Sequence, residues 1–97
     1  KGETIEPVTL LRLGKTYEKM GDYTQALDYY ANLLNNHKDC IYRDEALYYS
    51  AEIYNVNLND AEKAKPLYEE IIFKHEDSIY FVDSRNKYRK LRGDTNL

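Results

Sequence analysis

The sequence predicts an all-α fold, an α-solenoid of two helix–turn–helix repeats followed by a C-terminal capping helix. Three observations carry this prediction. A segment recurs within the chain, the apolar residues follow helical spacing, and no segment alternates polar and apolar residues as a half-buried strand would. Residues 37–42 (HKDCIY) recur 38 positions later as residues 75–80 (HEDSIY). A period of this length with helical patterning is typical of stacked helix pairs.

The first repeat covers about residues 7–37 and contains two predicted helices. Pro7 stands at the first helical position, where its missing N–H costs nothing. Gly21 is placed to end the first helix, and Asp22 to cap the second, with Gln25 three positions later. The apolar residues lie on one face of each helix, and they are Leu10, Leu13, Gly14 and Tyr17 in the first and Ala26, Leu27, Tyr30, Leu33 and Leu34 in the second.

The second repeat covers about residues 42–75 and follows the same scheme. Asn59 or Asp60 is expected to cap its second helix. Pro66 lies early in that helix, so we expect a slight kink or a later helix start instead of a break. Tyr17 and Tyr54 are 37 residues apart instead of 38, a slip that we expect a loop to absorb. The apolar positions of this repeat are Leu47, Ser50, Ala51 and Tyr54, then Ala64, Leu67, Tyr68, Ile71 and Ile72.

A fifth helix is predicted from about residue 78 to residue 92, where Gly93 ends it. Its inward positions are expected to be Ile79, Val82, Tyr88 and Leu91. With this capping helix, residues 1–97 form a single domain. Because the chain begins at Lys1 without Met, we expect it to be the C-terminal fragment of a longer protein.

Composition excludes several classes of function. The net charge of −3 gives no general attraction to nucleic acid or to an anionic membrane. No stretch approaches the ~20 apolar residues of a transmembrane helix. Cys40 is the only cysteine, so neither an intrachain disulfide nor a thiolate metal cluster can form.

These residues resemble the tetratricopeptide repeat, whose pattern is W-x2-L-G-x2-Y, then A-x3-F, then P. Residues 7–92 carry the resemblance, which implies a right-handed solenoid. Matching or substituting positions in the first repeat are Leu10, Leu13, Gly14, Tyr17, Ala26, Tyr30 and Lys38. Those in the second are Leu47, Ser50, Ala51, Tyr54, Ala64, Tyr68 and Glu76.

The linker at residues 39–46, echoed at residues 77–80, is similar to that of bacterial TolA-binding proteins of the tol-pal system. Those proteins carry a P-x-S-x-Y-x-x-x-A linker, whose Pro is missing from both copies here. The resemblance implies a protein-binding scaffold of the bacterial cell envelope, with the periplasm favoured and the cytoplasm also compatible.

Residues that could carry chemistry are better explained structurally. His37 and His75 are repeat-equivalent and have no further ligand at metal-binding spacing. Cys40 lies three residues from His37 with no group to orient the pair. The acidic pairs 69–70 and 76–77 fit solvated positions. We therefore expect no enzyme activity, no metal and no cofactor.

Basic residues gather in the last helix, at Arg85, Lys87, Arg89, Lys90 and Arg92. Cations are favoured near a helix C-terminus, which explains most of them. Binding of phosphate or nucleic acid is the alternative that this pattern leaves open.

A protein–protein interaction scaffold is the leading prediction. In the family that the chain resembles, the first helix of each pair lines a concave groove that holds a peptide or helix of a partner. We expect Tyr48 to lie at the groove's centre, because it is about 100° around the helix from Leu47. Carried over by position, the groove residues are Leu11, Lys15, Tyr48, Glu52, Asn55, Asn86 and Lys90. Leu11 and Lys15 stand where a chaperone-tail clamp would need Lys and Asn, so such tails are disfavoured.

The alternative prediction is a structural C-terminal cap of a longer helical solenoid, with no ligand of its own. Such a cap should expose an apolar patch at residues 8–11, where a preceding repeat would dock. Self-association through the solenoid ends would follow from the same feature. Neither reading involves nucleic acid or insertion into a membrane.

Overall fold

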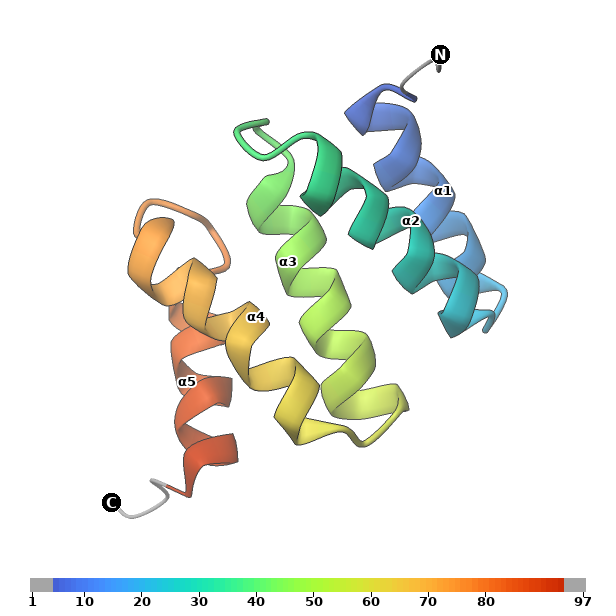
Figure 1. The fold of residues 1–97 in the computed structure, drawn as a ribbon. Helices are drawn as coiled ribbons and strands as arrows, with labels where there is room; N and C mark the ends of the chain where they lie inside the picture. The colour runs from blue at the N-terminus through green and yellow to red at the C-terminus, as the bar shows by residue number, and fades with distance from the viewer. Residues whose placement is uncertain (1–4, 94–97) are drawn as a thin grey trace. The chain divides into compact units, whose positions relative to one another are not determined.

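The computed structural model describes residues 5–93 and shows a helical chain (Figure 1). Within these residues no strand is present, which confirms the predicted all-α fold. A short π-helix, η1, directly continues the third α-helix. The elements in order are α1 (Pro7–Lys19), α2 (Tyr23–Asn36), α3 (Arg43–Glu52), η1 (Ile53–Asn57), α4 (Ala61–Lys74) and α5 (Phe81–Arg92).

The chain divides into two compact units, residues 1–46 and residues 47–97. In the first unit, α1 packs against α2 around buried apolar side chains. Gly14 lies directly under the ring of Tyr30, since a Cβ atom at Gly14 would be 2.3 Å from Tyr30 Cε1. The residues with no exposed surface here are Leu10, Ala26, Tyr30, Leu33 and Ala46. The small residue that the repeat pattern demands at position 14 is thus explained by close helix packing.

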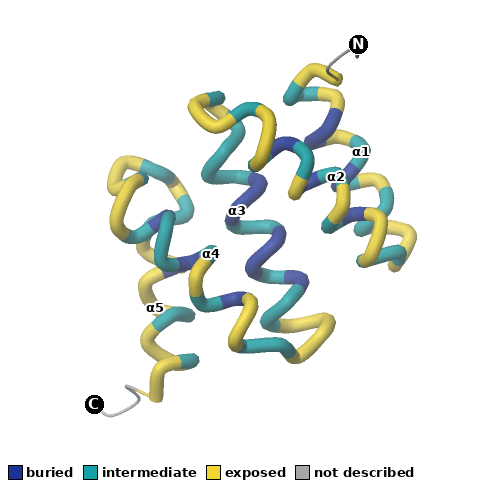
Figure 2. Tube along the Cα trace, viewed as in Figure 1, coloured by how far each residue is buried: buried dark blue, intermediate teal, exposed yellow. Residues whose placement is uncertain are grey.

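The second unit packs α4 against η1 and α5. Ala51, Ala64 and Tyr68 are fully buried and form the centre of its core. Buried residues follow one another along α3 in Figure 2, which colours them dark blue. Partly buried side chains surround this centre, and they are Tyr48, Tyr54, Leu67, Tyr88 and Leu91.

Helix ends follow the capping residues expected from the sequence. The side chain of Asp22 accepts a hydrogen bond from Gln25 N at 3.2 Å, and Asp60 accepts one from Lys63 N at the same distance. Asp60 is therefore the cap of α4, not Asn59. Gly21 and Gly93 follow α1 and α5 with φ of 81° and 92°, a left-handed conformation in which a Cβ atom is disfavoured.

The one-residue slip between the repeats is absorbed by η1, so the prediction that a loop absorbs it is wrong. In the first repeat the capping Asp22 donates its N–H to Tyr17 O, five residues earlier. In the second, Asp60 donates to Tyr54 O, six residues earlier, and Leu58 N bonds Ile53 O at 2.9 Å. The extra residue widens the last helical turn into a π-turn. The contact between the capping aspartate and the tyrosine of the preceding helix is therefore the same in both repeats.

One of the two alternatives for Pro66 is excluded at α4, and an expectation fails at α5. Pro66 lies inside α4, which begins at Ala61, so the helix continues through Pro66 as expected and does not start late. Ile79 and Val82 do not face inward, since they are 86% and 61% exposed. Ile79 lies in the turn before α5, outside the helical periodicity, and the buried residue of α5 is Ser84.

Candidate protein-binding face

An aromatic cluster joins α3 to the start of α5 within the second unit. The ring of Tyr48 stacks on that of Tyr80, with centroids 4.5 Å apart and an interplanar angle of 18°. Tyr49 meets Tyr80 edge-on at 6.1 Å, and Tyr68 meets Tyr48 in the same manner at 6.4 Å. Offset-stacked and edge-to-face arrangements are the favourable ones for aromatic rings. Tyr48 is thus held in one orientation by its neighbours.

A polar network runs beside these rings and is centred on Lys87. Its Nζ lies 2.6 Å from Glu52 Oε2, 3.2 Å from Asp83 Oδ2 and 3.3 Å from the Tyr48 hydroxyl oxygen. The Tyr48 hydroxyl in turn donates a hydrogen bond to Asp83. One cation therefore lies between two carboxylates, one from α3 and one from α5.

The network continues into the core of the second unit through Tyr68. This buried tyrosine donates its hydroxyl to Glu52 Oε2 at 2.5 Å and accepts from Asn55 Nδ2 at 3.3 Å. In the first unit the equivalent Tyr30 donates to Glu18 Oε1 at 2.9 Å. Both buried tyrosines thus satisfy their hydroxyl groups on the preceding helix, as burial of a polar group requires.

The network shifts the pKa values of its members. Burial, and then the hydrogen bond to Asp83, raise the pKa of Tyr48 to about 12. The bond from Tyr48 lowers the pKa of Asp83 below its ordinary value, with burial opposing this and Lys87 adding to it. Burial acts to lower the pKa of Lys87, but its bond to Glu52 and its other contacts outweigh burial and raise it. At neutral pH the charges of Asp83 and Lys87 and the neutral Tyr48 donor are therefore all favoured.

Two of the expected groove residues belong to the first unit. Lys15 Nζ forms an ion pair with Glu45 Oε2 at 2.8 Å, and 40% of the lysine side chain is exposed. Leu11 is only 5% exposed. The expectation that Leu11 faces a groove is therefore not met, since α1 turns this side chain into the protein.

The other expected groove residues fall into two sets in the second unit. Tyr48, Glu52 and Asn55 are brought together by the network just described. Asn86 and Lys90 are exposed on α5. Each lies three residues from a network member of that helix, so both share its face.

The sequence pattern places Tyr48 beside the core but does not predict its contacts with α5 and the residue that caps it. Its ring is half-buried against Tyr80 instead of projecting freely. A signal for the contact was present in the sequence. Tyr48 and Glu52 are four residues apart, as are Asp83 and Lys87, and their donors and charges are complementary.

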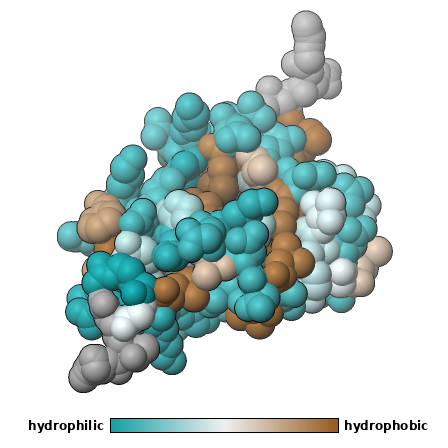
Figure 3. Space-filling view, turned by 60° about the horizontal axis from the view of Figure 1, so that its bottom comes forward, coloured by the Kyte–Doolittle hydropathy of each residue, from teal (hydrophilic) through white to brown (hydrophobic). Residues whose placement is uncertain are grey.

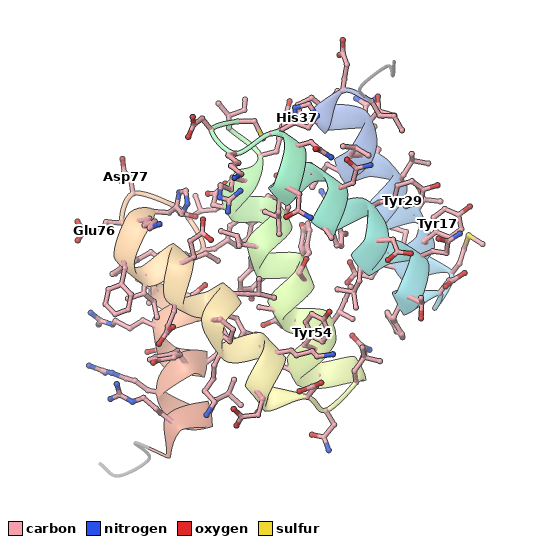
Figure 4. All side chains as sticks on the ribbon, in the orientation of Figure 1. Tyr17, Tyr29, His37, Tyr54, Glu76 and Asp77 are labelled. Carbon is pink, nitrogen blue, oxygen red and sulfur yellow. The ribbon has the colours of Figure 1, made fainter. Side chains whose placement is uncertain are left out.

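Residues considered for catalysis or metal binding are not assembled into a site. Between residues 5 and 93 no group of three or more His, Cys, Asp or Glu side chains is placed to hold a metal ion. His37 Nε2 lies 2.9 Å from Ile5 O, and His75 Nε2 lies 3.7 Å from Glu70 Oε2. Figure 4 shows Glu76 and Asp77 at the turn that follows α4, directed away from the helices.

Three further observations describe the surface and the helices. In Figure 3 hydrophobic residues appear as separate patches among hydrophilic ones. No helix within the described part of the chain is long and apolar enough to cross a membrane. Tyr17 and Tyr29 stack at 5.5 Å where α1 meets α2, and Figure 4 shows their rings side by side.

Helix pairs with matching caps, equivalent buried tyrosines and a shared turn define a helical-repeat protein. The sequence profile of the tetratricopeptide repeat family matches residues 9–39 and 45–78, and the chain belongs to this family. Repeats of this family generally mediate protein–protein interaction and generally have no enzymatic activity of their own. No curated protein and no solved structure shows significant similarity to the chain.

Proposed function

We propose that this chain is a scaffold that binds a peptide or helix segment of another protein on the face of the second unit that carries Tyr48 and Asp83. The observation that carries the proposal is the environment of Tyr48. This aromatic side chain is half-buried and held by a ring stack and by a hydrogen bond to Asp83. An aromatic group fixed before binding loses little conformational entropy when a partner packs on it, and such groups often dominate binding energy.

The surroundings of Tyr48 favour a segment of mixed character. The Asp83 side chain is 49% exposed, so this carboxylate still reaches solvent beside the aromatic cluster. Asn86 and Lys90 add an exposed amide and an exposed cation on the same face of α5. A segment with one apolar anchor between polar and charged residues would complement this face.

Exposed residues give the sharpest test, because Tyr48→Ala would remove packing as well as a binding group. The double variant Asn86→Ala/Lys90→Ala should lose a partner that the parent chain captures from cell extract, while its melting temperature stays within about 2 °C. The matched control is Asn35→Ala/Lys38→Ala, which removes the same two residue types from the end of α2 and the following turn. Equal capture by parent, variant and control would contradict the proposal.

The alternative role, a structural cap with no ligand, receives less support. It requires an exposed apolar patch at residues 8–11. In the structure Leu10 and Leu11 are 0% and 5% exposed, Val8 is half-buried, and the exposed residue is Thr9. Burial of this segment favours the binding role.

The linker resemblance to TolA-binding proteins favours the bacterial envelope as the setting of this interaction. The linker residues that carry this resemblance form a repeated turn, in which Cys40 N bonds His37 O and Ser78 N bonds His75 O. The N-terminal sequence of the parent protein tests the proposal directly, since a secretory signal there is the expected result.

A further inference from the structure

Helix α5 starts in the same register as α3, 38 residues later. Arg43 N bonds Cys40 O, and Ala46 N bonds Tyr42 O. The same two bonds recur from Phe81 N to Ser78 O and from Ser84 N to Tyr80 O. Each residue of α5 can therefore be assigned the role of the α3 residue 38 positions earlier.

This register places arginines where α3 and η1 have buried or half-buried residues. Arg85 corresponds to Leu47, Arg89 to Ala51 and Arg92 to Tyr54. In the second unit Leu47 and Ala51 are 1% and 0% exposed, and Ala51 packs with residues of α4. Arg85, Arg89 and Arg92 are instead exposed. We call these three residues of α5 the arginine face; it occupies the position on which the second helix of a repeat would pack.

Two members of the arginine face, Arg85 and Arg89, carry positive charge that the described structure does not neutralise. Arg85 and Arg89 form no ion pair with any residue from 5 to 93. Their neighbour Lys87, by contrast, is paired with both Glu52 and Asp83. This concentration of cations occurs in a chain whose net charge is −3, so it does not follow from general basicity.

Favourable interaction with the helix dipole explains part of this pattern but not all of it. Arg89 and Arg92 lie in the last turn of α5, where cations are stabilised. Arg85 lies before that turn. Its guanidinium group instead lies 5.7 Å from the centroid of the Phe81 ring, which leaves its N–H donors available to a partner.

We propose that the arginine face binds an acidic helix of another protein, lying along α5 where the second helix of a repeat would lie. Carboxylates at positions i, i+4 and i+7 of such a helix would match the spacing of Arg85, Arg89 and Arg92. Guanidinium groups bind carboxylates through two parallel hydrogen bonds, which gives geometric specificity as well as charge. Val82, which is 61% exposed and lies three residues before Arg85, offers an apolar contact at one end.

The centre of this surface lies away from the one in the proposed function. Arg85 lies about 200° around the helix from Asp83, and Arg89 borders the other surface because it lies three residues after Asn86. Loss of the interaction at Arg85 would therefore leave the face at Asp83 in place.

A protein helix fits the face better than a nucleic acid does. Three cations within about 11 Å of helix length make a short patch for a phosphate backbone. Acidic residues also lie elsewhere in this unit, including Glu69, Glu70, Glu76 and Asp77, and would repel an extended polyanion.

The test measures binding of a synthetic helical peptide to the full chain by fluorescence anisotropy. The peptide carries Glu at i, i+4 and i+7, one Leu to meet Val82, and Ala elsewhere. The parent chain should bind it saturably at low ionic strength, and Arg85→Glu/Arg89→Glu should weaken binding at least about tenfold. The matched control Arg12→Glu/Lys38→Glu makes the same change in net charge at exposed positions of the first unit and should weaken binding less than about twofold.

Three results would overturn the proposal. They are absence of saturable peptide binding to the parent chain, equal weakening by the two double variants, and tighter binding of a single-stranded RNA oligonucleotide than of the peptide. The last result would assign the face to nucleic acid. Circular dichroism of each variant is the folding control. It should show intact helices, because all four substituted positions are exposed.

Discussion

Gly14 and its repeat equivalent Ala51 differ by one methyl group, and the two repeats pack differently around this position. A Cβ atom at Gly14 would lie 2.3 Å from Tyr30 Cε1 and 2.8 Å from Tyr30 Cζ. Tyr30 cannot easily move away, because it is fully buried and its hydroxyl is bonded to Glu18. In the second repeat Ala51 fits in one core with Tyr68. The same position therefore accepts a methyl group in one repeat and excludes it in the other.

We predict that Gly14→Ala destabilises the protein in spite of the better helix propensity of alanine. Overpacking against Tyr30 should cost about 1–3 kcal/mol, and the propensity gain should return no more than about 1 kcal/mol. Urea denaturation followed by circular dichroism measures the difference. An unchanged or higher free energy of unfolding would mean that the Tyr30 ring adjusts freely.

At the scale of elements, η1 shows how a helix end can absorb an insertion. The π-turn at Ile53–Asn57 carries one residue more than the corresponding end of α1, yet both helices lead into an aspartate cap. Asn59 has φ of 54° where the first repeat has Gly21 with φ of 81°. Asparagine tolerates the left-handed region better than most residues with a Cβ atom. The helix end before α4 is thus a widened copy of the helix end before α2.

Deletion of Val56 should therefore be tolerated. This side chain is 65% exposed, and its removal would shorten the π-turn to the spacing found in the first repeat. We expect the free energy of unfolding to change by no more than about 1 kcal/mol, because the α-helical turn is the more common one.

Deletion of Glu69 is the matched control, since it removes one residue from the middle of α4. It should rotate the rest of that helix by about 100° and move the buried Ile71 out of the core. Urea denaturation of both deletion variants makes the comparison. Equal destabilisation by the two deletions would show that the extra residue of η1 is required.

At the scale of the whole molecule, α5 completes the second unit and has no helix partner of its own after it within the described residues. Tyr80, which caps α5, contributes the ring that stacks on Tyr48. Lys87, within α5, contributes the cation that pairs with Glu52. In a repeat protein, stability is close to a sum over elements and their neighbours, so a terminal element stabilises mainly the unit beside it.

A chain that ends at Asp77 should consequently be much less stable than the parent chain. It would lose the Tyr48–Tyr80 stack and both carboxylate contacts of Lys87, and it would expose part of the core around Tyr68. We expect the melting temperature to fall by more than about 5 °C. Thermal denaturation followed at 222 nm tests this, and an unchanged melting temperature would show that α5 does not stabilise the second unit.

Much of this organisation could be predicted from the sequence because it depends on local chemistry. Pro7 at the start of α1, Asp22 as a cap and Gly93 as a helix stop act through the backbone of their own turns. The candidate site was harder to predict. Tyr48 could be placed on the correct helix and near the correct face. Its hydrogen-bond partners and the ring stacked on it belong to α5 and its cap, more than thirty positions later, and only packing brings them together.

The sequence by itself determined the number of helices, the repeat period and the membership of the helical-repeat class, because helix propensity, capping and apolar periodicity are properties of short segments. Tertiary structure decided which residues reach the core in addition to, or in place of, the predicted apolar positions. Leu11 is buried although it lies beside the core position Leu10, and Ile79 is exposed although its spacing suited a buried stripe. Such outcomes depend on where a helix begins and on what packs against it. They are set by distant side chains competing for the same space, which no local pattern records.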